Sequence, residues 1–244
     1  MKTYLRDAWE TVIPPRDNPH GPLPGLLVLL TVVTGLVDAF SYLELGRVFV
    51  ANMTGNVVFL AFATGGAPGF VWWASLLAIF TFIGGAFVGG RIAHTQHGHR
   101  GRHLLRAAII QTVLVAASFI AALLFSAPYN VPALIVLIVL LGIGMGVQNA
   151  TARALAVPDL TTTVLTLTIT GISADSTAAG GTSSKLGRRV ISVASMFLGG
   201  LIGAWLVEAG HGPWVLLVAT LLLLVVTATA FRTIHSTEKW ATAS

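Results

Sequence analysis

Two short apolar runs decide how this chain folds: NVVFLAFAT at Asn56–Thr64 and VLTLTITGI at Val164–Ile172. Each has about half of the ~20 residues that a helix needs to cross ~30 Å of hydrocarbon. Six longer apolar segments surround them, and each has close to the full length required. The long segments are Gly25–Leu45, Phe70–Gly90, Leu104–Ser126, Pro132–Arg153, Val190–Glu208 and Trp214–Phe231. We expect the long segments to span a membrane, so the topology depends on whether the short runs also cross it.

The composition of the 244 residues supports a membrane protein. The chain is 55% hydrophobic and only 9% charged, and its mean hydropathy is +0.84. A water-soluble protein has about a quarter charged residues, so a soluble enzyme and a disordered chain are excluded. The absence of cysteine excludes disulfides, thiolate metal sites and thiol catalysis. The basic residues are scattered between apolar runs, which predicts contact with the lipid bilayer rather than with nucleic acid.

The distribution of Lys and Arg predicts the topology. If all eight apolar segments cross the membrane, 8 basic residues lie on the side of the N-terminus and 6 on the other. If the two short runs enter the membrane and return, 13 of the 14 lie on the side of the N-terminus and only Arg47 lies opposite. Short cytoplasmic loops are enriched in Lys and Arg. The second arrangement is therefore favoured, with both termini in the cytoplasm.

The predicted fold is an all-α membrane protein with six transmembrane helices and two short re-entrant half-helices. The order of long span, short run and long span recurs after roughly 110 residues, which predicts a 3+3 inverted repeat. We expect a cytoplasmic tail over residues 1–24, membrane repeats over 25–126 and 127–232, and a second cytoplasmic tail over 233–244. Repeats of this kind, with interrupted helices, are frequent in transporters.

Three short stretches of the first half correspond to stretches of the second half in this repeat. Asp38 corresponds to Gln148, and the stretch of residues 52–56 corresponds to that of 159–163. Gly85-xxx-Gly89 corresponds to Gly199-xxx-Gly203, and both patterns predict close packing of helices.

Asp38 is the carboxylate that lies well inside a predicted span. It belongs to a polar stripe at helical spacing, made of Thr31, Thr34, Asp38, Ser41 and Tyr42. An ionisable group at this depth is expensive unless it faces a polar cavity or a partner. Asp38 is therefore interpreted as a substrate or proton site. The alternative is a structural aspartate that bonds a neighbouring helix or the backbone amides near the first short run.

Side chains suited to helix N-caps precede both short runs. Asn52, Thr54 and Asn56 open the first, and Thr161, Thr162 and Thr163 open the second. Their oxygens can accept hydrogen bonds from the free N–H groups of a helix N-terminus. Two such N-termini, entering from opposite faces, would form a site for an anion or a hydrogen-bonding solute. Capping without a ligand is the alternative.

The end of the fourth long segment adds three polar residues, Gln148, Asn149 and Arg153. Gln148 and Asn149 are expected to supply hydrogen bonds to a solute. Arg153 is expected to pair with Asp159, to neutralise an anionic ligand or to extend toward the membrane surface. The His-rich stretch His94–His103 is interpreted as a cytoplasmic loop rather than a metal site, and no cofactor or metal is expected.

Three stretches resemble those of a known family. They are GLVDAFSY at 35–42, NMTGN at 52–56 and GMGVQNA at 144–150, and the chain from Gly25 to Phe231 is similar to the bacterial YoaK family of integral membrane proteins. The resemblance implies a bacterial inner-membrane protein with several spans. It implies no substrate, because the function of that family is not established. Residues 161–163 lack the Thr-Gly-Asn of the first half, so the symmetry of any site stays open.

These patterns predict a small transporter or channel-like permease for a polar solute or ion. The expected binding residues are Asp38, Asn52, Thr54, Asn56, Gln148, Asn149, Thr161, Thr162 and Thr163. The alternative function is a membrane accessory or sensor protein that binds another membrane protein. An enzyme is not expected, because one buried carboxylate without a His, Cys or metal cluster is a poor catalytic set. A homo-oligomer is compatible with the sequence.

Overall fold

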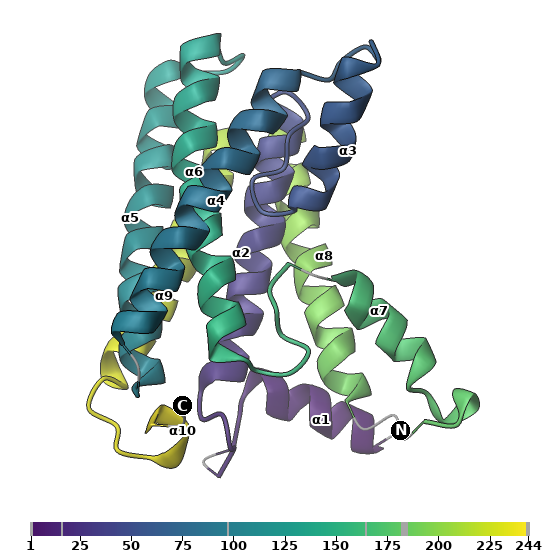
Figure 1. Cartoon of the computed structure of the whole chain (residues 1–244), viewed down its shortest axis with the longest axis vertical. Coiled ribbons are helices and arrows are strands. Elements are labelled where there is room, and N and C mark those ends of the chain that lie inside the picture. Colours follow the sequence, from purple (N-terminus) through teal and green to yellow (C-terminus); the bar gives the residue numbers. More distant parts are fainter. Residues whose placement is uncertain (1, 16, 97, 164, 182–184, 243–244) are drawn as a thin grey trace.

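The computed structural model describes all residues except 1, 16, 97, 164, 182–184 and 243–244, and its regular elements within that part are all helices (Figure 1). The first five are α1 (Lys2–Val12), α2 (Leu23–Glu44), α3 (Met53–Thr64), α4 (Trp72–Thr95) and α5 (Arg100–Phe125). They are followed by α6 (Val131–Leu155), α7 (Leu165–Ala174), the 3₁₀ turn η1 (Thr177–Ala179), α8 (Leu186–Glu208), α9 (Gly212–Arg232) and α10 (Lys239–Thr242).

Six of these helices are long and apolar enough to cross a membrane: α2, α4, α5, α6, α8 and α9. They correspond to the six long segments, so that prediction is confirmed. Local signals set several of their starts. The side chain of Asn130 accepts the N–H of Ala133 at 3.0 Å at the start of α6, and His99 accepts the N–H of Arg102 at 3.2 Å at the start of α5.

Helix α2 is the central element of the bundle. In its most apolar window 83% of the residues are buried, against 17% in α4 and 22% in α8. The polar stripe of α2 faces the interior, because Thr31, Thr34, Asp38 and Ser41 are all buried. The outer faces of α4 and α8 present large apolar side chains to the surroundings, as a lipid-facing helix does.

Two helix pairs, α2 with α8 and α4 with α6, approach backbone to backbone at glycines. A Cβ atom on Gly35 would lie 2.3 Å from the carbonyl oxygen of Met196, and one on Gly199 would lie 2.2 Å from that of Val32. On the other pair, a Cβ on Gly85 would lie 2.1 Å from the carbonyl oxygen of Ile143. The prediction that the glycine patterns allow close packing is therefore confirmed.

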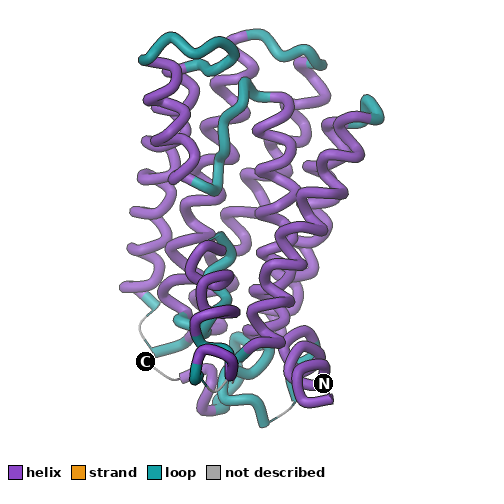
Figure 2. Tube along the Cα trace, turned by 90° about the vertical axis from the view of Figure 1, so that its right-hand side faces the viewer, coloured by secondary structure: helices purple, strands orange, loops and turns teal. Residues whose placement is uncertain are grey.

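The two short helices turn back toward the end of the bundle from which their loops came. The chain leaves α2 at the upper end in Figure 1, runs down to about mid-height, and returns upward through α3. It leaves α6 at the lower end, rises to about mid-height, and returns downward through α7. In Figure 2 the two loops run inside the bundle from its opposite ends toward the middle.

Both termini lie at the lower end of the bundle (Figure 1). The stretch expected to be a polar tail contains helix α1, which packs across the ends of α2 and α8. The C-terminal segment folds back onto the N-terminal one. The ring of Trp240 lies so close to Gly21 that a Cβ there would be 2.4 Å from it.

Adjacent glycines in α4 provide a test of this packing. We expect Gly85→Ala to destabilise the protein by about 1–3 kcal/mol, because its methyl group would collide with the backbone of Ile143. Gly84→Ala is the matched control, since no atom lies within 4 Å of a Cβ there. It should be neutral or stabilising by up to about 1 kcal/mol, the ordinary helix preference of Ala over Gly. Thermal unfolding in detergent measures both variants, and equal melting temperatures would contradict the packing.

Candidate functional site

Asp38 is buried in α2 and accepts hydrogen bonds from the loop that follows the helix. Its Oδ1 accepts the backbone N–H groups of Val50 at 3.1 Å and Ala51 at 2.9 Å. Its Oδ2 accepts the side-chain amide of Asn52. The carboxylate therefore holds the turn that leads into α3. This is the geometry of the structural alternative, in which Asp38 bonds the freed amides of the first short run.

Asn56 fixes the same loop from the other side. Its Oδ1 accepts the N–H of Phe49 at 2.9 Å, and its Nδ2 donates to the carbonyl of Phe49 at 2.5 Å. The ring of Phe49 stacks on Tyr42 with centroids 5.0 Å apart, and Phe59 lies 5.6 Å from Phe49. Polar side chains thus satisfy the backbone of the loop while aromatic rings cover it.

The capping expected at the start of the first short run is wrong in one respect. The helix begins at Met53 with Asn52 at the N-cap, but the side chain of Asn52 makes no capping hydrogen bond. Its amide is engaged by Asp38 instead. Thr54 is exposed on α3 and does not join the buried group. The N-terminus of α3 therefore lacks the side-chain cap that the sequence suggested.

The second loop repeats part of this chemistry without a carboxylate. The hydroxyl of Thr163 donates to the side-chain oxygen of Asn149, whose Nδ2 donates to the carbonyl of Met145 at 3.0 Å. Thr162 is buried, its hydroxyl has no hydrogen-bond partner among the described residues, and its φ is +65°. That left-handed conformation is strained for a β-branched residue. Thr161 is exposed.

Ion pairs from Arg189 on α8 hold the segments on both sides of α7, the loop before it and the residue after it. The Nε of Arg189 lies 3.1 Å from Oδ1 of Asp159, and its Nη2 lies 2.6 Å from Oδ2 of Asp175. A further N–H of Arg189 donates to the carbonyl of Gly171 at 2.5 Å. Arg153 is exposed and forms no ion pair with Asp159 in the described part of the chain, so that expected pairing is wrong.

Gln148 joins three helices at the centre of the bundle. Its Oε1 accepts from Gln111 on α5 at 2.5 Å, and its Nε2 donates to the hydroxyl of Thr34 on α2 at 2.8 Å. The same nitrogen also donates to the carbonyl of Leu30 at 3.3 Å. Sequence reasoning missed Gln111. The signal was present, because a lone amide in an apolar span requires a buried polar partner.

The polar side chains of these groups follow one another through the bundle, and we call this row the polar line. Asp38 bonds the first loop, and Thr34, one helical turn away on α2, bonds Gln148. Asn149, the next residue after Gln148, bonds Thr163 in the second loop. The line is not a continuous chain of hydrogen bonds, because among the described residues none joins Asp38 to Thr34 or Gln148 to Asn149. The sequence matched Asp38 with Gln148. In the hydrogen bonds, the counterpart of Asp38 is instead Asn149. Asp38 bonds the side chain of Asn52 and Asn149 bonds that of Thr163, and in both pairs the partner lies 14 residues further along the chain.

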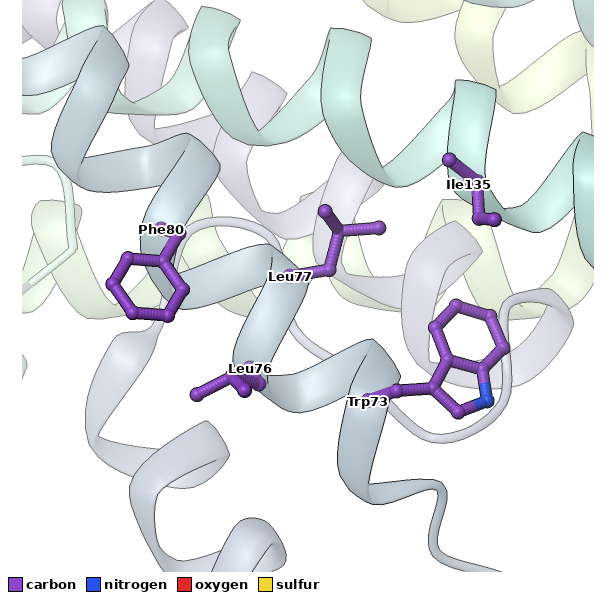
Figure 3. A pocket seen from close by; sticks show the side chains of 5 residues that line it. All are labelled: Trp73, Leu76, Leu77, Phe80 and Ile135. Atoms are coloured by element: carbon purple, nitrogen blue, oxygen red, sulfur yellow. The ribbon is translucent and has the colours of Figure 1, made fainter.

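A pocket of about 320 Å³ lies elsewhere, between α4 and α6 (Figure 3). Its walls are the side chains of Trp73, Leu76, Leu77, Phe80 and Ile135. This apolar lining suits a lipid chain rather than a polar solute. None of the candidate site residues contributes to it.

Comparison with known proteins agrees with this architecture. Residues 26–229 match the family described as "Protein of unknown function (DUF1275)". The chain is similar to the UPF0700 transmembrane protein YoaK of Bacillus subtilis (strain 168), with 37% identity over 152 residues. The match spans 62% of this chain and 65% of that relative. No solved structure matches the chain.

The family match covers most of the chain and includes both short helices, and the expected membership of the YoaK family is thereby confirmed. The chain is an integral membrane protein and, because residues 26–229 match the DUF1275 family, it belongs to that family.

Proposed function

We propose that this protein is a small-solute permease with a polar site near the bilayer centre. The observation that carries the proposal is the polar line, a row of polar side chains that lies between the two interior loops and includes Asp38, Thr34 and Gln148. Backbone that leaves a helix at membrane depth is tolerated where it lies within protein or lines a cavity. Transporters use such interrupted helices to build their binding sites.

The proposed permease has a 3+3 inverted repeat, and glycine contacts support it. Gly35 on α2 meets Met196 on α8, and Gly146 on α6 meets Phe82 on α4. Gly35 and Gly146 are 111 residues apart in the sequence, and their partners Phe82 and Met196 are 114 residues apart. Each half would therefore contribute one helix to each tightly packed pair. Three spans per half give the copies opposite orientations, so α3 and α7 would enter from opposite faces.

The proposed solute is polar and forms hydrogen bonds. The polar line offers amides and hydroxyls from Gln111, Gln148, Asn149 and Thr163, with Asp38 as the carboxylate. Asp38 would pair with a cation or carry a coupling proton. A catalytic role is not part of the proposal, because amides, hydroxyls and one carboxylate supply no nucleophile with an adjacent base.

The proposed location is the bacterial inner membrane, with both termini in the cytoplasm. The distribution of basic residues supports it, since 13 of the 14 Lys and Arg residues would then lie on the cytoplasmic side. The single exception, Arg47, follows α2 at the opposite end of the bundle.

A second candidate function is that of an accessory or sensor protein that binds another membrane protein. The hydrogen bonding of Asp38 favours it, because both carboxylate oxygens are occupied by the protein itself. A permease would have to open these bonds to admit a solute. This candidate predicts that a membrane protein co-purifies and that no solute is taken up by proteoliposomes.

Substitutions of Asp38 separate its charge from its structural bonds. Asp38→Ala leaves the two buried N–H groups of Val50 and Ala51 unpaired, each at about 1–3 kcal/mol, and also frees the partly buried amide of Asn52, so we expect a large drop in melting temperature. Asp38→Asn can keep the bonds from Val50 and Ala51 and should fold. In proteoliposomes screened with polar solutes under a pH gradient, wild type should accumulate a solute and Asp38→Asn should not.

The matched control for this experiment is Asp17→Asn, the same change at an exposed position in the segment before α2. It should transport like wild type. Full gradient-driven accumulation by Asp38→Asn would remove the coupling role. Absence of uptake by folded wild type for every solute, together with a co-purifying membrane protein, would favour the accessory function.

The proposed topology is tested with single cysteines, which the cysteine-free chain allows without further changes. Thr64→Cys, at the end of α3, should react with an impermeant maleimide added to intact cells whose outer membrane is permeabilised. Thr95→Cys, at the end of α4, should react only after lysis of the inner membrane. If all eight apolar segments crossed, the two positions would exchange sides, and the labelling pattern would be reversed.

A further inference from the structure

Three basic residues lie at the lower end of the bundle in Figure 1, each near the start of a long helix. His20 precedes α2, Arg100 begins α5, and Arg188 lies in the first turn of α8. Arg100 donates to the carbonyl of Leu155, and Arg188 donates to that of Pro158 at 3.4 Å. The two guanidinium groups therefore flank the same turn at the end of α6.

His20 lies within the field of both arginines. Its pKa is lowered by burial and by the charges of Arg100 and Arg188. Neither arginine forms an ion pair with a carboxylate among the described residues. The carboxylate of Asp7 accepts the backbone N–H of Arg188 at 3.2 Å, and no hydrogen bond to its guanidinium is seen among the described residues.

Two buried nitrogen atoms of Arg188 and His20 remain unpaired among the described residues. The Nε of Arg188 and the Nδ1 of His20 are buried and have no hydrogen-bond partner in the described chain. A guanidinium has five N–H donors, and a single backbone carbonyl is recorded as the acceptor for each of these arginines. Partly buried positive charge without a counter-charge is unfavourable.

We propose that His20, Arg100 and Arg188 form a binding site for a phosphate-type anion, either a free phosphate group or the headgroup of an acidic phospholipid. Guanidinium groups match the geometry of phosphate oxygens and bind them with charge-assisted hydrogen bonds. Basic pockets between transmembrane helices are suited to phospholipid headgroups. The site lies outside the polar line and does not depend on solute transport.

The full-length protein in a neutral detergent tests the site by its melting temperature. One arm titrates inorganic phosphate against chloride at constant ionic strength. The second arm compares dioctanoyl phosphatidylglycerol with dioctanoyl phosphatidylcholine. We expect a saturable rise of the melting temperature in at least one arm, with phosphatidylcholine inert. A response to both ligands indicates a site open to free phosphate, and a response to phosphatidylglycerol alone indicates a lipid site.

Variants assign the response to the cluster. Arg100→Gln combined with Arg188→Gln should weaken the apparent affinity at least about tenfold, because each lost charge-assisted contact contributes more than 1 kcal/mol. Arg102→Gln is the matched control. It lies on the same helix, is exposed, and donates to the carbonyl of Ile234 at 3.3 Å. It should keep the wild-type affinity.

Two results would overturn the proposal. One is a wild-type protein whose melting temperature responds to neither phosphate nor phosphatidylglycerol beyond the effect of ionic strength. The other is an unchanged affinity in the folded double variant. If the double variant does not fold, the two wild-type arms decide, and Arg188→Lys should bind more weakly because it loses the planar donor group.

Discussion

The fold depends on pairing the backbone polar groups of two loops that run inside a bundle of apolar helices. A free N–H or C=O group costs several kcal/mol in hydrocarbon, and the loop before α3 would expose several. Asp38 accepts two of these N–H groups, and Asn56 pairs with both backbone groups of Phe49. A carboxylate in a transmembrane helix is thus explained first by the loop it holds. Without it, the chain has no evident way to leave α2 and turn back within the bundle.

In the second half, the backbone polar groups of the loop must also be paired, and positively charged side chains contribute there. The loop after α6 has no carboxylate in the place of Asp38, and Asn149 pairs there with Thr163. Arginines instead bond carbonyl groups around this loop. Arg100 donates to the carbonyl of Leu155, and Arg188 donates to that of Pro158. Acceptors therefore serve the N–H groups of the first loop, and donors serve the C=O groups of the second. The arginines used in this way lie at the end of the bundle that carries both termini, in agreement with the overall distribution of positive charge.

The sequence predicted the features that depend on length, composition and local spacing. The six long helices, the inward polar stripe of α2 and the close packing at Gly85 follow from such patterns. The partners of the polar side chains could not be predicted, because they depend on non-local contacts. Asn52 was expected to cap a helix, yet its amide is taken by a carboxylate 14 residues earlier. The amide of Gln111 in an apolar span did indicate a buried polar partner, but its identity could not be predicted, because Gln148 lies 37 residues away and meets it only when α5 packs on α6.

In the proposed permease, the structural bonds of Asp38 and its coupling role would depend on the same carboxylate. The carboxylate is surrounded by donors, since Val50, Ala51 and Asn52 all present N–H groups to it. A proton on Asp38 would add a donor to this group and reduce its acceptor capacity, so protonation would weaken the bonds that hold the turn into α3. A cationic solute would compete with the same N–H groups for the carboxylate oxygens. In the proposed permease, loading of Asp38 would therefore release the first loop, and the arrangement with both carboxylate oxygens occupied would be the closed one.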